Sequence, residues 1–221
     1  MTPNHARLQI FIGGIRALPA SGRPTGMYKS PLRGPVLLAT DGFVGDQQAD
    51  LRVHGGPEKA VHLYPARHYA TLAARFPEAA AQLVPGSLGE NLSTGDLDER
   101  DVRIGDVWQL GRAQIQVCQP RSPCWKIDER FAADGMAQFI EEHRITGWYW
   151  RVLQTGEVRP GDSLTLVTPA LQAPTLHAAL VLWQQHRPPL AEFAALAETP
   201  GIAPRWREKM LQRLHYLEKL G

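Results

Sequence analysis

Apolar residues in the first three quarters of the chain recur in short runs that end at glycine, proline or aspartate, a pattern typical of β-strands joined by turns. If the run at 60–64 is extended, Val61 and Leu63 lie on one face and His62 and Tyr64 on the other. The predicted strands are 8–13, 36–40, 60–64, 102–110, 113–118 and 163–167, and the stretch rich in proline and glycine at 19–35 is a predicted loop.

Helical spacing of apolar residues occurs twice within this part and dominates after Pro169. The predicted helices are 65–76, 136–143, 176–185, 190–197 and 204–220. Pro65 suits a first helical turn, and Thr175 suits the N-cap of the helix that follows it. The last helix carries apolar residues at three- and four-residue steps: Trp206, Met210, Leu214, Leu217 and Leu220.

The change of pattern near 171–174 predicts two domains. Residues 1–170 form a mainly β body with a few helices, and residues 174–221 form a three-helix appendage. We expect the apolar face of the last helix to pack on the body or on a second subunit rather than to bind the cofactor. A homodimer is one form that this packing would give.

The composition is that of a globular protein. Hydrophobic residues make up 43% and charged residues 21%, and 18 prolines with 20 glycines agree with a turn-rich β body. The formal net charge of +2, without a run of Lys or Arg, argues against binding to nucleic acid. Two cysteines are too few for a disulfide scaffold. The first ten residues do not resemble a signal peptide and no apolar run approaches the roughly 20 residues of a membrane span, so we expect a cytoplasmic protein.

The segment 119–126 carries the strongest chemical signal. It follows a predicted strand, contains two prolines that stiffen it, and places Cys124 between Arg121 and Lys126. Neighbouring cations favour the thiolate, which is the form that binds metals or attacks electrophiles. Cys118 ends an alternating strand without an adjacent cation, so we interpret it as a packed core residue. Cys124 is therefore the predicted functional thiol.

Two further segments combine glycine with polar side chains. Their candidate site residues are His54, Gly55, Gly56, Lys59, His62, Glu90 and Asn91. The glycine pair can bring backbone amides close to a bound anion, and the histidines and the lysine can transfer protons or contact phosphate. The glutamate and the asparagine directly follow a glycine that can adopt a positive φ.

Four motifs stand in order along the chain: Gly-Asp-x-Gln-Ala-Asp at 45–50, x-His-Gly-Gly-Pro at 53–57, Gly-Glu-Asn-Leu at 89–92 and Gln-Pro-Arg-x-Pro-Cys-x-Lys at 119–126. Together they resemble the MOSC domain (molybdenum cofactor sulfurase C-terminal domain), in the YiiM-like subfamily that carries a C-terminal three-helix domain. The resemblance extends over about residues 36–166. It implies a MOSC-type β-barrel body that binds a molybdopterin-type molybdenum cofactor, with Cys124 as the ligand to the metal.

The resemblance also implies an activity, because this subfamily is associated with the reduction of N-hydroxylated bases such as hydroxylaminopurines. This reaction consumes two electrons and two protons and releases the hydroxyl oxygen as water, and it is chemistry that the cofactor supplies. The residues implied at the site are Arg121, Lys126, Gly55, Gly56, Lys59, Glu90 and Asn91 for the cofactor, and His54 or His62 as proton donor beside Cys124. The sequence has no flavin, haem or iron–sulfur motif, which implies a separate electron-donor protein.

The residues alone leave three other functions open. Cys124 could be the nucleophile of a hydrolase or transferase, with His54 or His62 as its base. The same three side chains could bind zinc. The protein could also be a non-catalytic carrier of molybdopterin or sulfur. Metal analysis separates zinc from molybdenum, and turnover of a hydroxylamine separates a reductase from a carrier.

Overall fold

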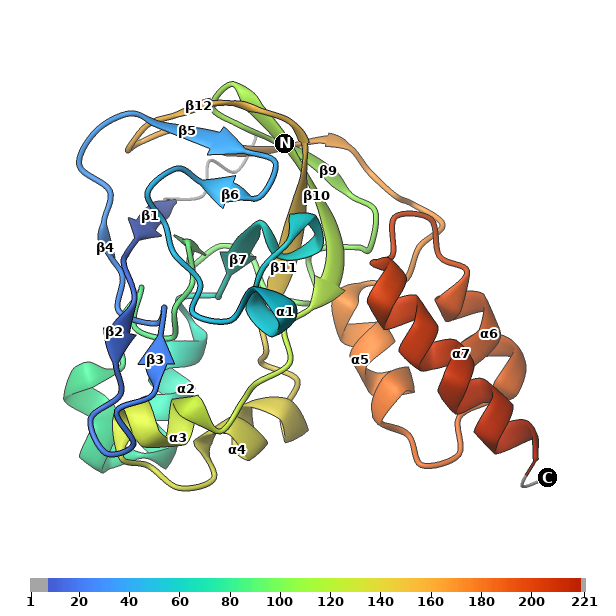
Figure 1. The fold of residues 1–221 in the computed structure, drawn as a ribbon. Helices are drawn as coiled ribbons and strands as arrows, with labels where there is room; N and C mark the ends of the chain where they lie inside the picture. The colour runs from blue at the N-terminus through green and yellow to red at the C-terminus, as the bar shows by residue number, and fades with distance from the viewer. Residues whose placement is uncertain (1–7, 220–221) are drawn as a thin grey trace.

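The protein consists of a curled β-sheet with helices at one end and a bundle of three helices beside it (Figure 1). The structure is a computed structural model that describes residues 8–219. The first seven residues, which belong to the segment compared with signal peptides, and Leu220 of the predicted apolar helix face lie outside the described residues. Within residues 8–219, no helix combines the length and the hydropathy that a membrane span requires.

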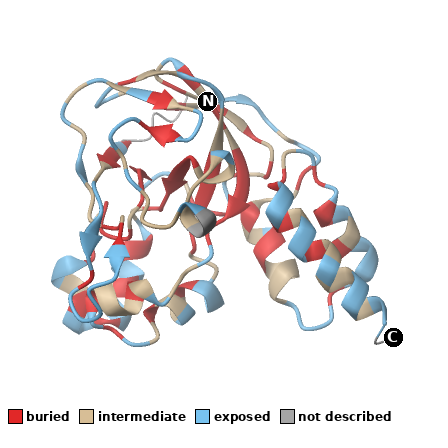
Figure 2. Ribbon diagram, viewed as in Figure 1, coloured by how far each residue is buried: buried red, intermediate tan, exposed pale blue. Residues whose placement is uncertain are grey.

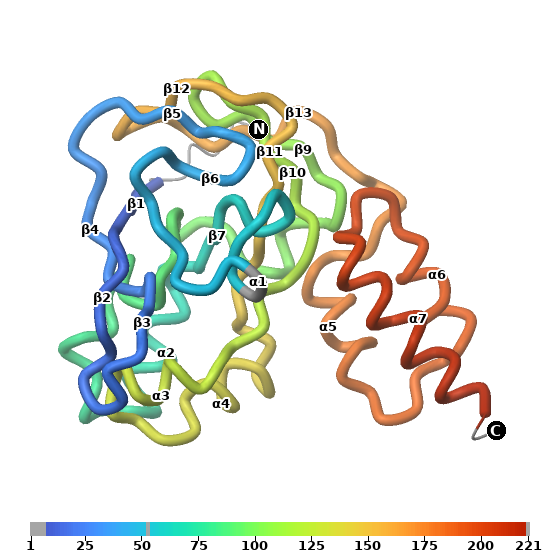
Figure 3. Tube along the Cα trace, in the orientation of Figure 1, coloured from blue at the N-terminus to red at the C-terminus, as the bar shows by residue number. Residues whose placement is uncertain are grey.

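The main sheet has eight strands in the order β13-β9-β10-β11-β7-β8-β1-β4. Neighbouring strands pair antiparallel except β7 and β8, which pair in parallel. The sheet curls into a half-barrel (Figure 3), which confirms the predicted mainly β, MOSC-type body but leaves the barrel open on one side. The strands are β1 Gln9–Ile12, β4 Ser30–Pro31, β7 Val61–Leu63, β8 Leu92–Ser93, β9 Val107–Leu110, β10 Ala113–Pro120, β11 Trp148–Gln154 and β13 Leu164–Thr168.

Shorter elements complete the body and the bundle. A three-stranded sheet has the order β12 (Gly156–Val158), β5 (Val36–Ala39) and β6 (Gly42–Phe43). A two-stranded sheet pairs β2 (Arg16–Ala17) with β3 (Pro24–Thr25). The helices of the body are α1 Leu51–His54, η1 Pro57–Lys59, α2 His68–Arg75, η2 Pro77–Gln82, α3 Lys126–Phe131 and α4 Met136–Glu142. Those of the bundle are α5 Leu176–Gln184, α6 Leu190–Ala197 and α7 Pro204–Glu218.

Two apolar clusters hold these elements together. The smaller one lies among α2, η2, α3 and α4. The larger one lies along the main sheet and continues into the bundle, where Phe193, Trp206 and Met210 belong to the same cluster as Val117 and Cys118. Figure 2 accordingly shows buried positions along the inner strands and on the facing sides of α5–α7. The bundle therefore packs on the body, one of the two expected arrangements, while the boundary near residue 171 stays a prediction.

Local signals account for the elements that were predicted well. The Thr175 hydroxyl accepts the Ala178 backbone N–H at 3.2 Å, which confirms the predicted N-cap of α5. The predicted strand 102–110 is too long, because β9 begins only at Val107. Before it, the Asp106 carboxylate accepts the backbone N–H groups of Arg103 (2.8 Å) and Ala170 (2.7 Å) and holds this stretch as a turn.

Candidate functional site

The loop that carries Cys124 leaves the central strand β10 and leads directly into α3. The Cys124 carbonyl oxygen accepts the Ile127 backbone N–H at 3.0 Å, so the thiol lies just before the first turn of that helix. Cys124 is half-buried, and it is a free thiol. Cys118 is fully buried, burial raises the pKa of its thiol, and the thiol donates to the Glu58 carbonyl oxygen at 3.2 Å. These contacts support the interpretation of Cys118 as a packed core residue.

A cavity of about 600 Å³, open to solvent, extends from Cys124 into the body. Seven of the ten predicted site residues line it: His54, Lys59, His62, Asn91, Arg121, Cys124 and Lys126. They come from α1, η1, β7, the 86–92 loop and the segment 119–126. Motifs more than 60 positions apart in the sequence thus converge on one space, as pairing between distant strands allows.

Arg121 is the most unusual group in this cavity. Its residue is only 6% exposed, its Nη1 atom has no hydrogen-bond partner, and no carboxylate among the described residues forms an ion pair with it. Lys126, by contrast, donates from Nζ to the Pro24 carbonyl oxygen at 2.8 Å. A buried guanidinium with an unsatisfied donor and no ion pair is unfavourable, and it suits a site that takes an anionic ligand.

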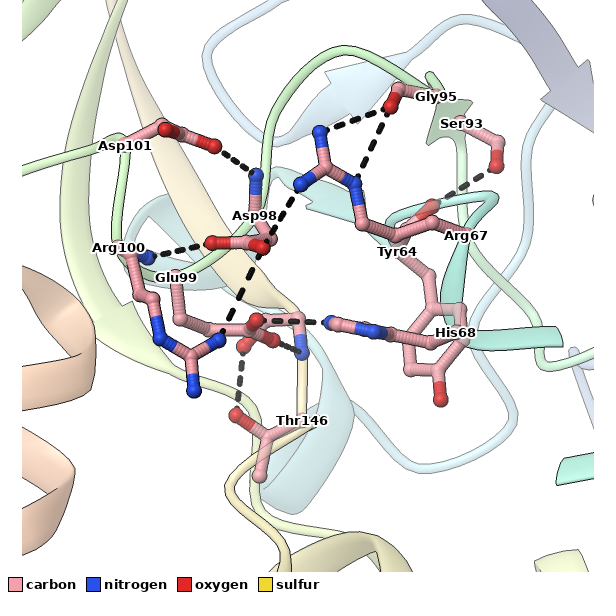
Figure 4. A network of polar contacts seen from close by, with 11 residues as sticks. Tyr64, Arg67, His68, Ser93, Gly95, Asp98, Glu99, Arg100, Asp101 and Thr146 are labelled. Atoms are coloured by element: carbon pink, nitrogen blue, oxygen red, sulfur yellow. Dashed lines mark hydrogen bonds and ion pairs between the residues drawn. The ribbon is translucent and has the colours of Figure 1, made fainter. Parts of the chain in front are cut away.

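A buried network around Glu99 and His68 (Figure 4) holds Gly147, the residue that binds the Arg121 backbone. The Glu99 carboxylate accepts the Gly147 backbone N–H at 2.7 Å and lies 2.8 Å from His68 Nε2. The Gly147 carbonyl oxygen in turn accepts the Arg121 backbone N–H at 3.1 Å. Gly147 has a φ of 66°, and a Cβ there would lie 2.3 Å from the Leu63 carbonyl oxygen, so no other residue fits.

The two histidines of the cavity are neutral near pH 7. Burial, followed by the charges of Arg121 and Lys59, lowers the pKa of His54 to about 4. Burial and the Arg121 charge also hold the pKa of His62 well below its usual value. The Nε2 atom of His62 is buried and has no partner. A neutral imidazole is a weak acid, so neither residue is a ready proton donor in the protein alone.

Two residues that were not predicted as site residues also line the first cavity. Lys29 and Asp46 form a buried ion pair beside the cavity, and burial lowers the pKa of Lys29. The Asn91 side-chain amide donates to Asp46 Oδ2 at 2.9 Å and its oxygen accepts the His62 backbone N–H at 3.1 Å. Asp46 stands in the first motif, but no local signal marks Lys29, whose partner lies 17 positions away.

Three predicted site residues do not line the cavity. The Glu90 carboxylate is fully buried and accepts the Tyr69 hydroxyl at 2.5 Å and the Gly86 and Leu88 backbone N–H groups at 2.6 and 3.1 Å. Its oxygens therefore hold the 86–92 loop, and Glu90 is not among the residues that line the cavity. Gly55 and Gly56 form the turn between α1 and η1, and they place His54 and Lys59 on the cavity wall without lining it themselves.

A second cavity, of about 830 Å³, opens on the other side of Cys124. His54, Lys59, Cys124 and Tyr149 line both cavities. The opposite wall of the second one comes from α7, through Arg205, Trp206 and Lys209. The last helix therefore lines a cavity beside the thiol loop. The expectation that it does not bind the cofactor stays a prediction.

The donor set fits one of the two metal hypotheses. Among the described residues, no three histidine, cysteine or acidic side chains converge as a metal-binding group. His54, His62 and Cys124 thus do not form the three-ligand zinc site that the sequence left open. A single thiol beside the unpartnered Arg121 Nη1 fits a cofactor that brings most of its own ligands and carries negative charge.

The half-barrel and this thiol site are those of a MOSC-domain protein. Residues 50–165 match the MOSC domain family, and the chain belongs to that family. It is 36% identical to Protein YiiM of Escherichia coli (strain K12) over 207 residues, which cover 93% of this chain and 91% of YiiM. The crystal structure of Escherichia coli YiiM has a TM-score of 0.81 and covers 97% of this chain and 94% of that one, at 29% identity. The predicted YiiM-like membership is confirmed.

A third similar protein is larger. It is a protein of Gibberella moniliformis (strain M3125 / FGSC 7600) named "Reductase", 36% identical over 162 residues. The match covers 72% of this chain and 29% of that protein.

Proposed function

We propose that this protein is a molybdenum-cofactor-dependent reductase that detoxifies N-hydroxylated compounds, such as hydroxylaminopurine-type bases. Its MOSC family membership and its similarity to a protein named reductase support an oxidoreductase. The observation that carries the proposal is the position of Cys124, a half-buried free thiol that lines two cavities, close to a buried arginine whose Nη1 has no hydrogen-bond partner.

The chain's own residues would hold the cofactor. Cys124 would bind the molybdenum through its sulfur, and Arg121 and Lys126 would bind anionic groups of the pterin, where a guanidinium offers a two-pronged contact and an ammonium a point charge. The chemistry that such a cofactor supplies is a two-electron change at molybdenum with acceptance of one oxygen atom. Since a flavin, haem or iron–sulfur motif is absent from the sequence, the electrons would come from a separate donor protein.

Lys59 is the residue that would hold a proton at the site. It lines both cavities, and its Nζ lies 5.6 Å from the centre of the Tyr149 ring. Burial and the charges of Arg205 and Lys209 lower the pKa of Lys59, so its ammonium gives up a proton more readily than an exposed lysine would. His54, neutral at pH 7, would accept a proton and pass it on rather than start as the donor.

The test begins with protein made in cells that synthesise the molybdenum cofactor. Elemental analysis should find stoichiometric molybdenum, and reduction of 6-N-hydroxylaminopurine with a chemical electron donor should yield adenine and water. Molybdenum without turnover would favour a carrier of the cofactor. A protein that holds neither molybdenum nor pterin would refute the proposal and leave the cysteine hydrolase or transferase as the next hypothesis to assay.

A further inference from the structure

The Glu99 carboxylate is buried next to the residue that holds the Arg121 backbone, and each of its oxygens has a partner. Glu99 is 1% exposed. Its Oε1 atom accepts the Gly147 backbone N–H at 2.7 Å, and its Oε2 atom lies 2.8 Å from Nε2 of His68, which is itself buried. Neither Glu99 nor His68 is among the residues that line the first or the second cavity. Burying a carboxylate is costly unless its contacts compensate for the lost water, so the contacts of Glu99 indicate its role.

The backbone from which this carboxylate extends is held at two helices (Figure 4). Arg67, at the N-cap of α2, donates from its guanidinium to the Gly95 carbonyl oxygen at 2.8 and 3.1 Å and to the Asp98 carboxylate at 2.9 Å. The Glu99 carbonyl oxygen accepts the backbone N–H of His177, in the first turn of α5, at 2.7 Å. The Glu99 side chain therefore starts from a position that both the body and the bundle hold.

Gly147 connects this position to Arg121. Its carbonyl oxygen accepts the Arg121 backbone N–H at 3.1 Å and the Thr146 hydroxyl at 2.9 Å. The N–H that Glu99 holds and the carbonyl that holds Arg121 flank a single Cα atom, so a shift of the carboxylate reaches Arg121 through one residue. Gly147 is also confined, because a Cβ at this position would meet the Leu63 carbonyl oxygen.

We infer that Glu99 is a positioning residue of the cofactor site, which holds Arg121 in place through Gly147 while His68 orients its carboxylate. The inference rests on the proposed function. A guanidinium binds an anionic group with two prongs only in the right orientation, so its support matters as much as its charge. Residues that orient a ligand-binding group without touching the ligand commonly contribute ten- to a hundredfold to affinity. A buried carboxylate could instead act through its negative charge alone, which leads to a different expectation.

Two substitutions of Glu99 separate its position from its charge. Glu99→Gln removes the charge but keeps the length and an oxygen that accepts the Gly147 N–H. Glu99→Asp keeps the charge but is one methylene shorter and cannot reach both partners. In protein made in cells that synthesise the cofactor, Glu99→Asp should weaken retention of molybdenum on the order of tenfold, and Glu99→Gln should stay close to the parent. A role of the charge alone would give the reverse order.

A matched control changes the length of another buried carboxylate. Asp106 also holds two backbone N–H groups, those of Arg103 and Ala170, and it lines neither cavity. Asp106→Glu should lower Tm and leave molybdenum per folded molecule unchanged. His68→Phe is a second variant, in case Glu99→Asp does not fold. It keeps a ring and removes the contact to Oε2, so it should lose molybdenum in the same direction but to a smaller extent.

A second readout needs no cofactor. The charges that mainly shift the pKa of His54 are those of Arg121, Lys59, Lys126 and Asp50, so Glu99 affects it through the position of Arg121. In cofactor-free Glu99→Asp, the pKa of His54, followed by NMR, should rise from about 4 towards 6.5 as the guanidinium moves away. It should stay near 4 in Glu99→Gln and in Asp106→Glu.

Two results would overturn the inference. An unchanged pKa of His54 and full molybdenum in Glu99→Asp, with only Tm lowered as in Asp106→Glu, would make Glu99 a structural residue. Equal losses in Glu99→Gln and Glu99→Asp would show that its charge matters and its position does not. Failure of the proposed function looks different, because the parent protein would then hold no molybdenum. A rise in the pKa of His54 in cofactor-free Glu99→Asp would still show that Glu99 positions Arg121.

Discussion

Replacing Arg121 with methionine should stabilise the cofactor-free protein and weaken cofactor binding. The buried guanidinium has an unpartnered Nη1 and no ion pair among the described residues. Folding without a ligand therefore carries the desolvation cost of this group. Methionine is a flexible apolar side chain that can fill the same space without that cost. The variant should be more stable than the parent when both lack cofactor.

The magnitude follows from the unpartnered donor. An unsatisfied buried donor costs about 1–3 kcal/mol, part of which the variant loses again through imperfect packing. A net gain of about 1 kcal/mol corresponds to a rise of roughly 2–4 °C in Tm for a chain of this size. If Arg121 makes one charge-assisted hydrogen bond to the cofactor, its loss should weaken cofactor binding on the order of ten- to a hundredfold.

The assay is thermal unfolding of cofactor-free protein together with the molybdenum content of protein made with the cofactor. Arg151→Met is the matched control, because the Arg151 guanidinium forms an ion pair with Glu58 and also contacts Gln116 at 3.3 Å. Removing a paired arginine should lower Tm. Arg121→Lys keeps the charge without the two-pronged contact and should lose less cofactor than Arg121→Met.

A lower Tm together with an unchanged molybdenum content in Arg121→Met would contradict both expectations. Arg121 would then be a structural residue. A spectroscopic readout adds an independent check, since the Arg121 charge helps to lower the pKa of His54. In Arg121→Met the pKa of His54, followed by NMR, should rise from about 4 towards its ordinary value of 6.5 without reaching it, because burial remains.

Four further substitutions test single residues. Cys124→Ser should abolish molybdenum retention and Cys118→Ser should leave it unchanged; equal molybdenum contents by elemental analysis would reject Cys124 as the ligand. With the pKa of His54 at about 4 in the folded state and 6.5 as its ordinary value, the unfolded chain binds more protons in between, so stability is full above pH 6.5 and falls as pH drops towards 4. In His54→Gln, the free energy of unfolding measured with denaturant should fall less over this pH range than in the parent protein. The difference should be at most about 3 kcal/mol, and less where solvent screens the half-buried ring. An identical fall in both proteins would mean that other groups cause it. Glu90→Gln should lower the free energy of unfolding by about 1–3 kcal/mol without changing molybdenum per folded molecule, and selective cofactor loss would restore Glu90 to the site.

The sequence predicts the bundle well but misses one central strand of the sheet, for one physical reason. Helix α6 occupies 190–197 as predicted, because spacing and termini are local signals. Strand β11, Trp148–Gln154, was not predicted although it lies between β10 and β7. Its first three residues, Trp148 to Trp150, are all buried, so the alternation of polar and apolar positions that marks a half-exposed strand is missing.

The site residues also divide into those that local sequence signals mark and those that they do not. The motif residues could be found because glycine, cysteine and basic residues stand together in short segments. Lys29 could not, since its role depends on an ion pair across the fold. Glu90 stands in a motif like the others, but a carboxylate can hold a loop or bind a ligand, and only its burial and its three donors decide between them. Arg205 and Lys209 reach the site through packing that no local pattern predicts.

Strand β10 explains why the body and the bundle act on one site. Its Cys118 carbonyl oxygen holds the start of α7, and its last residue, Pro120, pairs with Trp148 next to the glycine that fixes the Arg121 backbone. The thiol loop begins where these contacts end. A change in the packing of this strand would therefore shift the buried cation, the thiol and the basic end of α7 together. Substitutions that change side-chain volume in the core around Cys118 should consequently alter ligand binding in both cavities, whereas Cys118→Ser nearly conserves that volume and should not.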